Sequence, residues 1–572
     1  MRGNDVGDGS GTGMGRRRFI RLGGAAVAGA TTVGLNGAQA VAALPTDGGD
    51  ELAEVGVPKS VGLTVPKHRE GVGTTFAPDP IEDGTPRLSS RANRAPAGAS
   101  FPDKGAEPVP VDVPTSAPFD FEMAGYRPQD VPERLRPWRN SIAKKVDTGP
   151  HDADGVRMFP LDGKLLDHPV GQIQFGLQNI AAWRRATSSA DRAFFLARAR
   201  AQADRLIEKR MLARGAWYFP YPFAYSIANY SGIDYEANWV SGMAQGESLS
   251  LFSQLCEILT GPDDRATYRT AADAAFASLL KAPNPDAPGD PWVVMSQVGY
   301  LWIQEYPQAN VQKSDFTYNG FLFAILGLWD YYQLTRDKLV ADLFDGSLTT
   351  IATAFSSIRN KGWYSSYCVT HRPPHVNYHK IHIELLLQMH WLSGKANLAH
   401  LSDTLVNDAP PARIDNGAVV FGKGTHTFHR FSSTGAITST KKLKLTRASQ
   451  ANTSLRTRIR NRGGVYYLIS NGAAKGWCVQ ESYPKVFLRG QWLTSEYAPH
   501  RTATFPARRA ITAYKYGTNG AAGHTRTVTF TRASNAPFDA RAVVNGRIMV
   551  RISAGFLTNY WVQANQITAN TT

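Results

Sequence analysis

Cysteine is scarce in this chain of 572 residues, which contains only three. Cys256, Cys368 and Cys478 are far apart and odd in number, so they do not make a disulfide framework and lack the spacing of zinc ligands. We expect Cys256 to be a small buried hydrophobic residue. Long apolar runs are also missing: beyond the N-terminus none reaches about 18 residues, which excludes a multi-span membrane protein. Hydrophobic residues still make up 42% of the chain, which excludes wholesale disorder.

Acidic residues are scarce in the C-terminal quarter of the chain. Between Ala412 and Thr572 there are four Asp or Glu residues against 23 Lys or Arg, an excess of 19 positive charges. The net charge of the whole chain is only +16, so the remainder is slightly acidic. The basicity therefore belongs to one part of the protein and says little about the chemistry of the rest. Such a surface attracts polyanions, and salt weakens that attraction.

The first 43 residues have the layout of a secretory signal. RRRFI at residues 16–20 precedes a short, mildly apolar stretch, and AQA at residues 38–40 resembles a cleavage site. Paired arginines in this context are typical of a twin-arginine signal, which exports proteins that have already folded. We expect cleavage near Ala40 or Ala43. The mature protein is then extracellular or cell-wall associated, with no membrane span after signal removal.

The remaining sequence divides into parts that differ in composition and hydrophobic pattern. Residues 44–118 are rich in Pro, Gly, Ser and Thr and are expected to be a disordered linker. Residues 119–408 are helical and aromatic, which favours stacked helical hairpins, either a bundle or an incomplete (α/α) toroid whose loops line a polysaccharide groove. The seven stretches with helical patterns are 172–186, 189–212, 240–259, 265–281, 317–334, 339–358 and 378–392.

The basic C-terminal part has the short alternating runs and Gly/Asn turns of β-strands. It also contains an internal repeat in three ordered blocks. RFSSTGA at residues 430–436 parallels KYGTNGA at 515–521, and LTRAS at 445–449 parallels FTRAS at 530–534. YLIS and GWCVQ between residues 467 and 480 parallel VRIS and NYWVQ between 550 and 563. We expect two small β units, residues 412–496 and 497–572, making a multidomain protein with an all-β tandem tail.

Several segments of the helical part match one enzyme family in order. They are DHPVGQIQFGL (167–177), WVSGMAQG (239–246), QEYP (304–307), YNGF (318–321), GLWD (327–330) and NYHKIHI (377–383). Together they resemble the C-terminal domain of D-glucuronyl C5-epimerases, isomerases that convert D-glucuronate to L-iduronate within polysaccharides such as heparosan. The resemblance implies an acidic, glucuronate-containing polysaccharide as substrate. By itself it also suggests a homodimer, and no cofactor is expected.

The implied reaction explains which residue types matter. The enzyme removes the C5 proton, which is α to the carboxylate, and returns a proton on the opposite face of the sugar. The site therefore needs an acid and a base on opposite faces. It also needs groups that stabilise the enediolate-like charge on the carboxyl group. A tyrosine whose phenol pKa is lowered suits such an exchange, because it gives or takes a proton with little reorganisation.

The resemblance carries particular roles onto this sequence. Glu305 and Tyr306 match a Glu-Tyr pair that looks catalytic, Tyr378 matches the tyrosine before a His-x-x-His, and Tyr364 matches a second tyrosine upstream. We expect Tyr306 and Tyr378 to be the opposed proton donor and acceptor, with Glu305 assisting one of them. The implied substrate contacts are Asn319, Met243, Ala244, Gln245 and Gly246. Ordinary aromatic packing is the alternative for all three tyrosines in a chain with 22.

One departure from the family concerns the uronate carboxylate. After its second tyrosine the family has Asp-Leu-Arg-His, whereas SSYC at residues 365–368 follows Tyr364 here, so the arginine that would clamp the carboxylate is absent. His371, Arg372 or His375 is the expected replacement. The N-terminal β region of animal members also has no clear counterpart.

Four histidines, His371, His375, His379 and His382, raise the question of a metal. No carboxylate accompanies them at a convincing spacing, Glu384 being the only near one. We expect substrate contact or hydrogen-bonded structure for these histidines and no metal site.

The basic tail faintly resembles SH3-like wall-binding modules. An exported protein meets anionic wall polymers and acidic polysaccharides rather than nucleic acid, so we expect the tail to hold the protein on wall polymers. Trp477, Trp492 and Trp561 are either core or sugar-stacking residues.

Two other functions stay open: a polysaccharide lyase or glycoside hydrolase on an (α/α) toroid, and a non-catalytic wall-polymer binding protein.

Overall fold

A computed structural model gives the fold of the chain. It describes residues 98–571 except 104, 227–233, 312–313, 410–416, 433–434, 462–463 and 518. The expected signal, residues 1–43, and most of the expected linker lie outside the described residues. Within the described part, no helix is long and apolar enough to cross a membrane.

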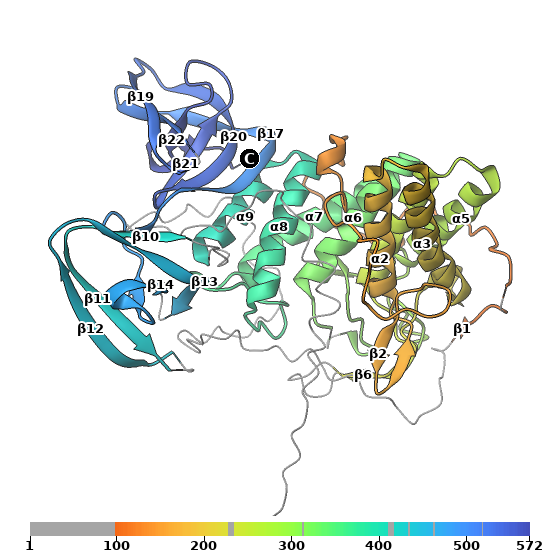
Figure 1. Cartoon of the computed structure of the whole chain (residues 1–572). Coiled ribbons are helices and arrows are strands. Elements are labelled where there is room, and N and C mark those ends of the chain that lie inside the picture. The colour runs from red at the N-terminus through yellow and green to blue at the C-terminus, as the bar shows by residue number, and fades with distance from the viewer. Residues whose placement is uncertain are drawn as a thin grey trace, which may run out of the picture.

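Eight α-helices of the described residues form four consecutive helical hairpins (Figure 1). Connections of two or three residues within each hairpin make its two helices antiparallel. The stacked hairpins expected from the sequence are thus confirmed. The hairpins are α2 (Pro169–Arg185) with α3 (Ser189–Glu208), α4 (Gly242–Ile258) with α5 (Pro262–Ser278), α6 (Tyr318–Thr335) with α7 (Lys338–Ile358), and α8 (Val376–Ser393) with α9 (Ala396–Asp408).

Local sequence explains where several helices begin and end. Ser188 caps α3 and Asp337 caps α7, each with a side-chain oxygen that accepts a backbone N–H of the first turn. Helix α8 ends at Ser393, and the next residue, Gly394, adopts φ 71°, a left-handed conformation that costs glycine little. Helix α9, which the sequence patterns did not predict, follows after Lys395, a residue that makes no side-chain cap.

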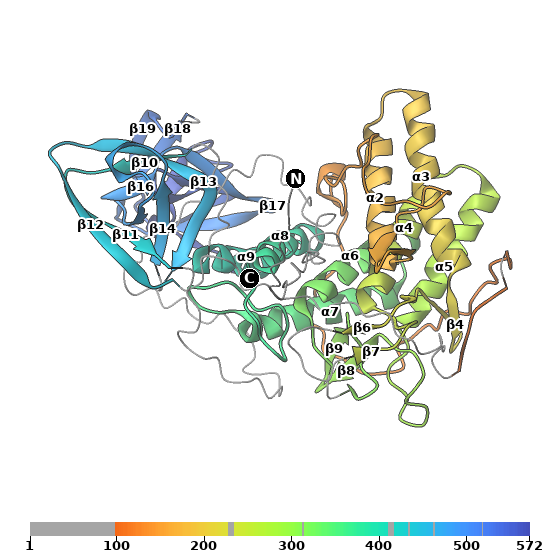
Figure 2. The ribbon, with the colours of Figure 1, turned by 60° about the horizontal axis from the view of Figure 1, so that its bottom comes forward.

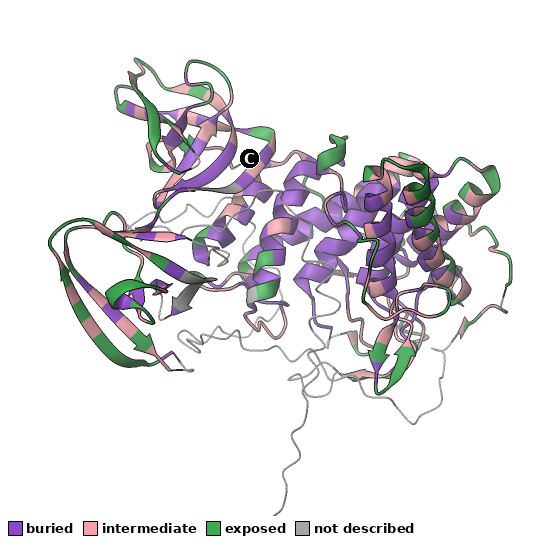
Figure 3. Ribbon diagram, in the orientation of Figure 1, coloured by how far each residue is buried: buried purple, intermediate pink, exposed green. Residues whose placement is uncertain are grey.

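The first helices of the hairpins, α2, α4, α6 and α8, pack against one another in chain order. Gly246 of α4 and Gly327 of α6 let two backbones meet: a Cβ on Gly246 would lie 2.3 Å from the Cα of Ala324. Gln174 of α2 donates to Glu247 of α4 at 2.9 Å. Successive residues of α4 meet successive residues of α6 in the same direction, so these neighbours are parallel. Figure 3 shows them as the most buried part of the molecule.

Short strands lie at one end of this helical domain. In Figure 2 the two-stranded sheets β6–β7 and β8–β9 lie side by side there. Residues 98–121, which include the end of the expected linker, run along the domain: Val111, Val113 and Phe121 pack against its core. The strands are β1 (Ala99–Ser100) with β4 (Met211–Ala213) and β5 (Ala216–Tyr218), β2 (Phe159–Leu161) with β3 (Lys164–Leu166), β6 (Tyr225–Ser226) with β7 (Asp234–Tyr235), and β8 (Val294–Gln297) with β9 (Tyr300–Ile303).

Two seven-stranded antiparallel sheets follow, and they share one topology. The spatial order is β12-β11-β15-β14-β13-β10-β16 in the first and β19-β18-β22-β21-β20-β17-β23 in the second. Each strand of the second sheet corresponds to the strand seven places earlier. The first sheet contains β10 (Ala418–Phe421), β11 (Gly424–Phe431), β12 (Ile437–Leu445), β13 (Ser449–Asn461), β14 (Gly464–Ile469), β15 (Cys478–Gln480) and β16 (Val486–Leu488). The second contains β17 (Gln491–Phe505), β18 (Ala510–Tyr516), β19 (Ala522–Thr529), β20 (Ser534–Val544), β21 (Arg547–Ile552), β22 (Trp561–Gln563) and β23 (Thr568–Ala569).

The repeated sequence blocks fall at equivalent places in the two sheets. RFSSTGA ends in the turn between β11 and β12, and KYGTNGA in the turn between β18 and β19. Gly435 and Gly520 adopt φ 79° and 75° in these turns, and each donates its N–H to a carbonyl three residues earlier. The second sheet takes its first strand from Gln491, so Tyr497 lies within β17.

The second β unit docks on the last helical hairpin (Figure 1). Trp391 of α8 donates its indole N–H to the carbonyl of Glu496 at 2.8 Å. Asp403 of α9 accepts from the hydroxyl of Tyr497 at 2.6 Å and from Arg501 at 2.9 Å. Leu387, Trp391 and Ala399 share an apolar cluster with strand residues of this unit. The helical domain and the second β unit therefore have a common core.

Candidate active site

The site begins where β9 ends, at Gln304. Its backbone carbonyl accepts the N–H of Gly242, the first residue of α4, at 2.8 Å. Its side-chain oxygen accepts the N–H of Phe316 at 3.2 Å. A Cβ on Gly242 would lie 2.4 Å from that carbonyl oxygen, so the close approach needs glycine. Gln304 thus fixes the next two residues, Glu305 and Tyr306, between the N-terminal ends of α4 and α6.

Glu305 is buried with its carboxylate against the first turn of α6. A Cβ on Gly320 would lie 2.1 Å from Oε2 of Glu305, so only glycine leaves room for the acid. The N-terminal end of a helix favours a negative charge there. Burial, and after it the charge of Glu305, raise the pKa of Tyr221 and of Glu247. Burial and the charge of Glu305 therefore both favour the neutral form of Glu247.

Tyr306 lies at the edge of an aromatic wall. Its ring stacks on Tyr225 with centroids 5.9 Å apart, and Trp239 and Tyr235 lie at 5.9 and 6.1 Å. Trp239 in turn stacks on Tyr221 at 3.9 Å. These rings come from β6, β7 and the segments beside them, which face the end of β9 (Figure 2). The wall gives the site flat apolar faces on which a sugar ring can stack.

Tyr378 enters the site from the first turn of α8. His375 caps this helix: its Nδ1 accepts the backbone N–H groups of Asn377 and Tyr378 at 3.2 and 3.4 Å. The rings of His375 and Tyr378 are 4.7 Å apart. His375, one of the three residues expected to replace the family arginine, thus touches a candidate catalytic tyrosine.

Tyr367 joins the two sides of the site. Its hydroxyl lies 3.5 Å from the hydroxyl of Tyr306 and 3.4 Å from Oε2 of Glu305, and its ring is 4.4 Å from that of Tyr378. The structure thus brings Glu305, Tyr306, Tyr367 and Tyr378 together. Tyr367 is only 3% exposed.

Tyr364, by contrast, contacts Trp363 and His379 through its ring, at 5.0 and 5.6 Å. The sequence also contains a signal for Tyr367. Setting the family's Tyr-Asp-Leu-Arg-His run on residues 367–371 keeps its tyrosine and its histidine, whereas setting it on 364–368 keeps only the tyrosine.

Asn319 fits the expected substrate contact. It lies in the first turn of α6, beside Gly320, and is 3% exposed. Its Oδ1 is buried with no hydrogen-bond partner among the described residues. A buried acceptor without a donor is costly, and a hydroxyl of a bound sugar would satisfy it.

The expected substrate turn forms the start of α4. Ala244 and Gln245 are fully buried. The side chain of Gln245 bonds Phe219 N, the Trp217 carbonyl and the Ser278 hydroxyl at 2.8–2.9 Å. Gly246 lies at the crossing with α6. Substrate contact by Met243, Ala244, Gln245 and Gly246 stays a prediction, and the structure gives the last three packing roles.

The remaining histidines and Arg372 have separate partners. His379 and His382 both bond the hydroxyl of Ser365, at 3.0 and 2.8 Å, which fixes the loop before Tyr367. Arg372 points to the C-terminal end of α7, 3.4 Å from the Arg359 carbonyl. His371 bonds Asp315. The four histidines therefore do not converge on one point.

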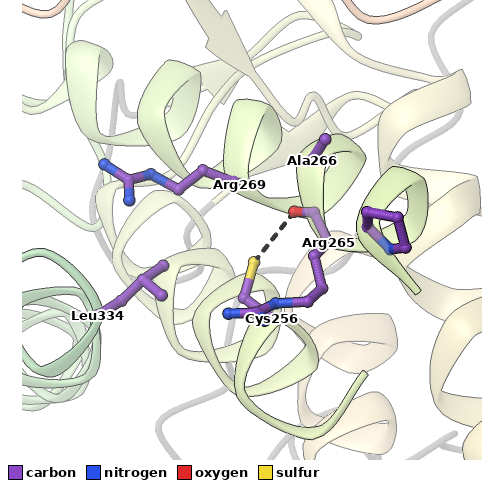
Figure 4. Close-up of a pocket in the computed structure, with 6 residues that line it drawn as sticks. Cys256, Arg265, Ala266, Arg269 and Leu334 are labelled. Atoms are coloured by element: carbon purple, nitrogen blue, oxygen red, sulfur yellow. Dashed lines mark hydrogen bonds between the residues drawn. The ribbon is translucent and has the colours of Figure 1, made fainter. Parts of the chain in front are cut away.

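A surface pocket of about 360 Å³ lies elsewhere (Figure 4). It is lined by Cys256, Arg265, Arg269 and Leu334, among others, at the C-terminal ends of α4 and α6. The tyrosines occupy the opposite, N-terminal ends. Burial raises the pKa of Cys256 to about 11, which makes this thiol unreactive and agrees with its expected role as a buried small residue.

Comparison with known proteins identifies the domain. Residues 214–405 match the family model of the D-glucuronyl C5-epimerase C-terminus. This part of the helical domain is therefore similar to the D-glucuronyl C5-epimerase family. No curated protein matches the chain. The matched stretch contains the aromatic wall and the Glu305 cluster, which is made of Glu305, Tyr306, Tyr367 and Tyr378, and it ends before the β units.

The cap on α8 makes the stability of the helical domain sensitive to acid. Burial lowers the pKa of His375 to about 4 from an ordinary value near 6.5, and only the neutral ring accepts the two N–H groups. Because the pKa is depressed in the folded state, the contribution to stability is complete above about pH 6.5 and is lost as the pH falls toward 4.

His375→Asn keeps an acceptor that does not titrate. Between these pH values the unfolding free energy of the wild type should fall more steeply, by about 1.4 kcal/mol per pH unit, than that of the variant. Urea unfolding at several pH values measures both slopes, and equal slopes would contradict the assignment.

Proposed function

We propose that this protein is a uronate C5-epimerase that converts D-glucuronate to L-iduronate residues in an acidic polysaccharide. One observation carries the proposal: Glu305, Tyr306 and Tyr367 meet within 3.5 Å, and Tyr378 packs on Tyr367, inside the domain that matches the epimerase family. The row of hairpins with parallel neighbouring helices is compatible with an incomplete (α/α) toroid.

The cluster supplies a proton route on each side of the sugar. Tyr306 serves one face of C5 and Tyr378 the other, so that one proton leaves and a different one arrives. The hydroxyl of Tyr367 lies between Tyr306 and the Glu305 carboxylate and passes a proton between them. Exchange among groups already in contact needs little reorganisation, which is what a positioned acid or base contributes.

The aromatic wall and Asn319 hold the polymer. Tyr225 and Trp239 present ring faces next to Tyr306, and Asn319 offers its buried carbonyl oxygen to a sugar hydroxyl. Tyr378 lies on α8, and Tyr306 follows β9 directly after Gln304, which bonds the first residue of α4, so rigid elements hold both tyrosines in place during the reaction.

The same proposal includes export by the twin-arginine pathway and retention on anionic wall polymers through the basic β units. Exposed strands support retention: Lys442 and Lys444 lie on β12, where six of the nine residues are exposed (Figure 3). Arg430 and Lys441 lie over the ring of Trp477, at 4.6 and 5.8 Å, so cations rather than a free sugar-stacking face surround this residue. Trp561 is buried in the second unit, while the side chain of Trp492 lies outside the described part of the structure.

Incubation of the purified protein with glucuronate polymers in heavy water tests the reaction. Deuterium at C5 without chain cleavage is the expected result. Absorbance from an unsaturated sugar would instead identify a lyase, which shares the proton abstraction but expels the C4 oxygen. No change on any acidic polymer would favour a non-catalytic binding protein.

A further inference from the structure

A second cluster of chemically active side chains lies beside the tyrosines. Asp315, Cys368 and His371 each offer one donor atom, and these atoms all lie within 4.8 Å of one another. They come from two paired segments: Thr317 and Cys368 form a β-bridge, and Val369 donates its N–H to the Phe316 carbonyl at 3.2 Å. The backbone thus fixes two of the three residues before their side chains interact.

The donor atoms converge on one point. Nδ1 of His371 bonds the carboxylate of Asp315 and also lies 3.7 Å from Sγ of Cys368. In a nucleophilic Cys-His-Asp triad the acid and the thiol contact opposite nitrogens of the ring, because the imidazole passes a proton between them. Here both approach the same nitrogen, so the arrangement is not a relay.

Convergence of a thiol, an imidazole and a carboxylate is the pattern of a metal site. We propose that Asp315, Cys368 and His371 bind a zinc ion. Zinc takes sulfur, nitrogen and carboxylate oxygen as ligands, and a tetrahedral ion separates a sulfur and a nitrogen ligand by about 3.5 Å, close to the distance between Cys368 and His371. A thiolate ligand disfavours calcium and magnesium, which prefer oxygen.

The surroundings suit a three-ligand site. Asp315 is 1% exposed and Cys368 fully buried, whereas the His371 side chain is 27% exposed, so the fourth ligand position faces the solvent. The hydroxyl of Thr317 donates to the other carboxylate oxygen of Asp315 at 3.3 Å, which orients the acid. On binding, the hydrogen bond between His371 and Asp315 opens, the imidazole keeps its proton on Nε2 so that Nδ1 is a free ligand, and the Cys368 thiol releases its proton to the solvent, so that all three groups bond the ion.

A bound zinc would hold the loop that carries Tyr367. The segment of Asp315 leads directly into α6 with Asn319, and the segment of Cys368 follows Tyr367. The ion would therefore clamp the two chain segments that supply these side chains. This site rests on its own geometry and does not depend on the reaction proposed above.

Cobalt(II) is the probe, because it replaces zinc and gives a near-ultraviolet charge-transfer band when a thiolate binds it. The full chain, stripped of metal, is titrated with cobalt chloride and then with zinc chloride. We expect one cobalt per chain with a thiolate band, displaced by one equivalent of zinc. Cys368→Ser should abolish the band, while Cys256→Ser and Cys478→Ser, which remove the other two buried thiols, should keep it.

Asp315→Asn provides a second variant in case Cys368→Ser does not fold, as judged by circular dichroism. It keeps the shape of the side chain and should weaken cobalt binding by more than about tenfold. Three results would overturn the proposal: no thiolate band in the wild type, a band that survives in folded Cys368→Ser, or unchanged cobalt affinity in Asp315→Asn.

Discussion

Tyr367→Phe should lower the rate of C5 proton exchange by about 10²–10⁴-fold, the usual contribution of a positioned acid or base. Tyr306→Phe and Tyr378→Phe should have effects of the same order. Each change deletes one hydroxyl and keeps the ring, so the contacts at 4.4 Å between Tyr367 and Tyr378 and at 5.9 Å between Tyr306 and Tyr225 are retained. The measurement is deuterium incorporation at C5 of a glucuronate polymer in heavy water.

Tyr364→Phe is the matched control, because it removes the same atom from the same loop three residues away. Its ring contacts Trp363 and His379 and is not part of the Glu305 cluster. The variant should therefore retain most of the activity. Full activity in Tyr367→Phe, or an equal loss in Tyr364→Phe, would show that the proton route is assigned to the wrong tyrosine.

Asp403→Ala should lower the free energy of unfolding by about 3–5 kcal/mol, because it removes the carboxylate that balances the charge of two buried arginines. Arg501 and Arg541 are 2% and 4% exposed, and Asp403 lies 2.9 and 4.0 Å from them. It also accepts the hydroxyls of Ser495 and Tyr497. Urea unfolding of the mature chain measures the loss, which we expect as a shift of the transition shared by α9 and the second β unit.

Asp342→Ala controls for the removal of an acid from an ion pair. Its partners, Arg127 and Lys338, have side chains that are 60% and 85% exposed. Exposed pairs contribute at most about 1 kcal/mol, so this variant should change little. A loss of similar size in both variants would mean that Asp403 has no special place in the interface.

Much of the fold follows from local patterns. Each of the seven stretches with helical periodicity coincides with one of the helices α2 to α8, because an apolar stripe at that spacing can be buried only by a helix. Helix α9 was missed: it is the shortest of the described α-helices, and only two residues separate it from α8. The turn residues around Gly435 and Gly520 repeat in the sequence and predicted the duplication of the sheets. Both glycines adopt a left-handed conformation, so each turn needs glycine at the same place.

The site was only partly predictable. Glu305, Tyr306, Tyr378 and Asn319 were chosen from family resemblance, and the structure gathers them at the N-terminal ends of α6 and α8. Tyr367 was overlooked because it lies only three residues after Tyr364 in the same loop. No local pattern in the sequence decides which of the two corresponds to the tyrosine of the family. His371 illustrates the same limit: its partners Asp315 and Cys368 are brought to it by a β-bridge.

By itself, the sequence determined that positive charge is confined to the last quarter of the chain, that helices precede a duplicated β region, and that three cysteines form no disulfide framework. These are properties of composition, period and order along the chain. Only the tertiary structure decided which tyrosines meet and that four neighbouring histidines go to three different places. It also decided that a single cysteine finds an acid and an imidazole. Such contacts join residues far apart in the chain, and they depend on packing such as that of Gly246 against α6, which sequence spacing does not encode.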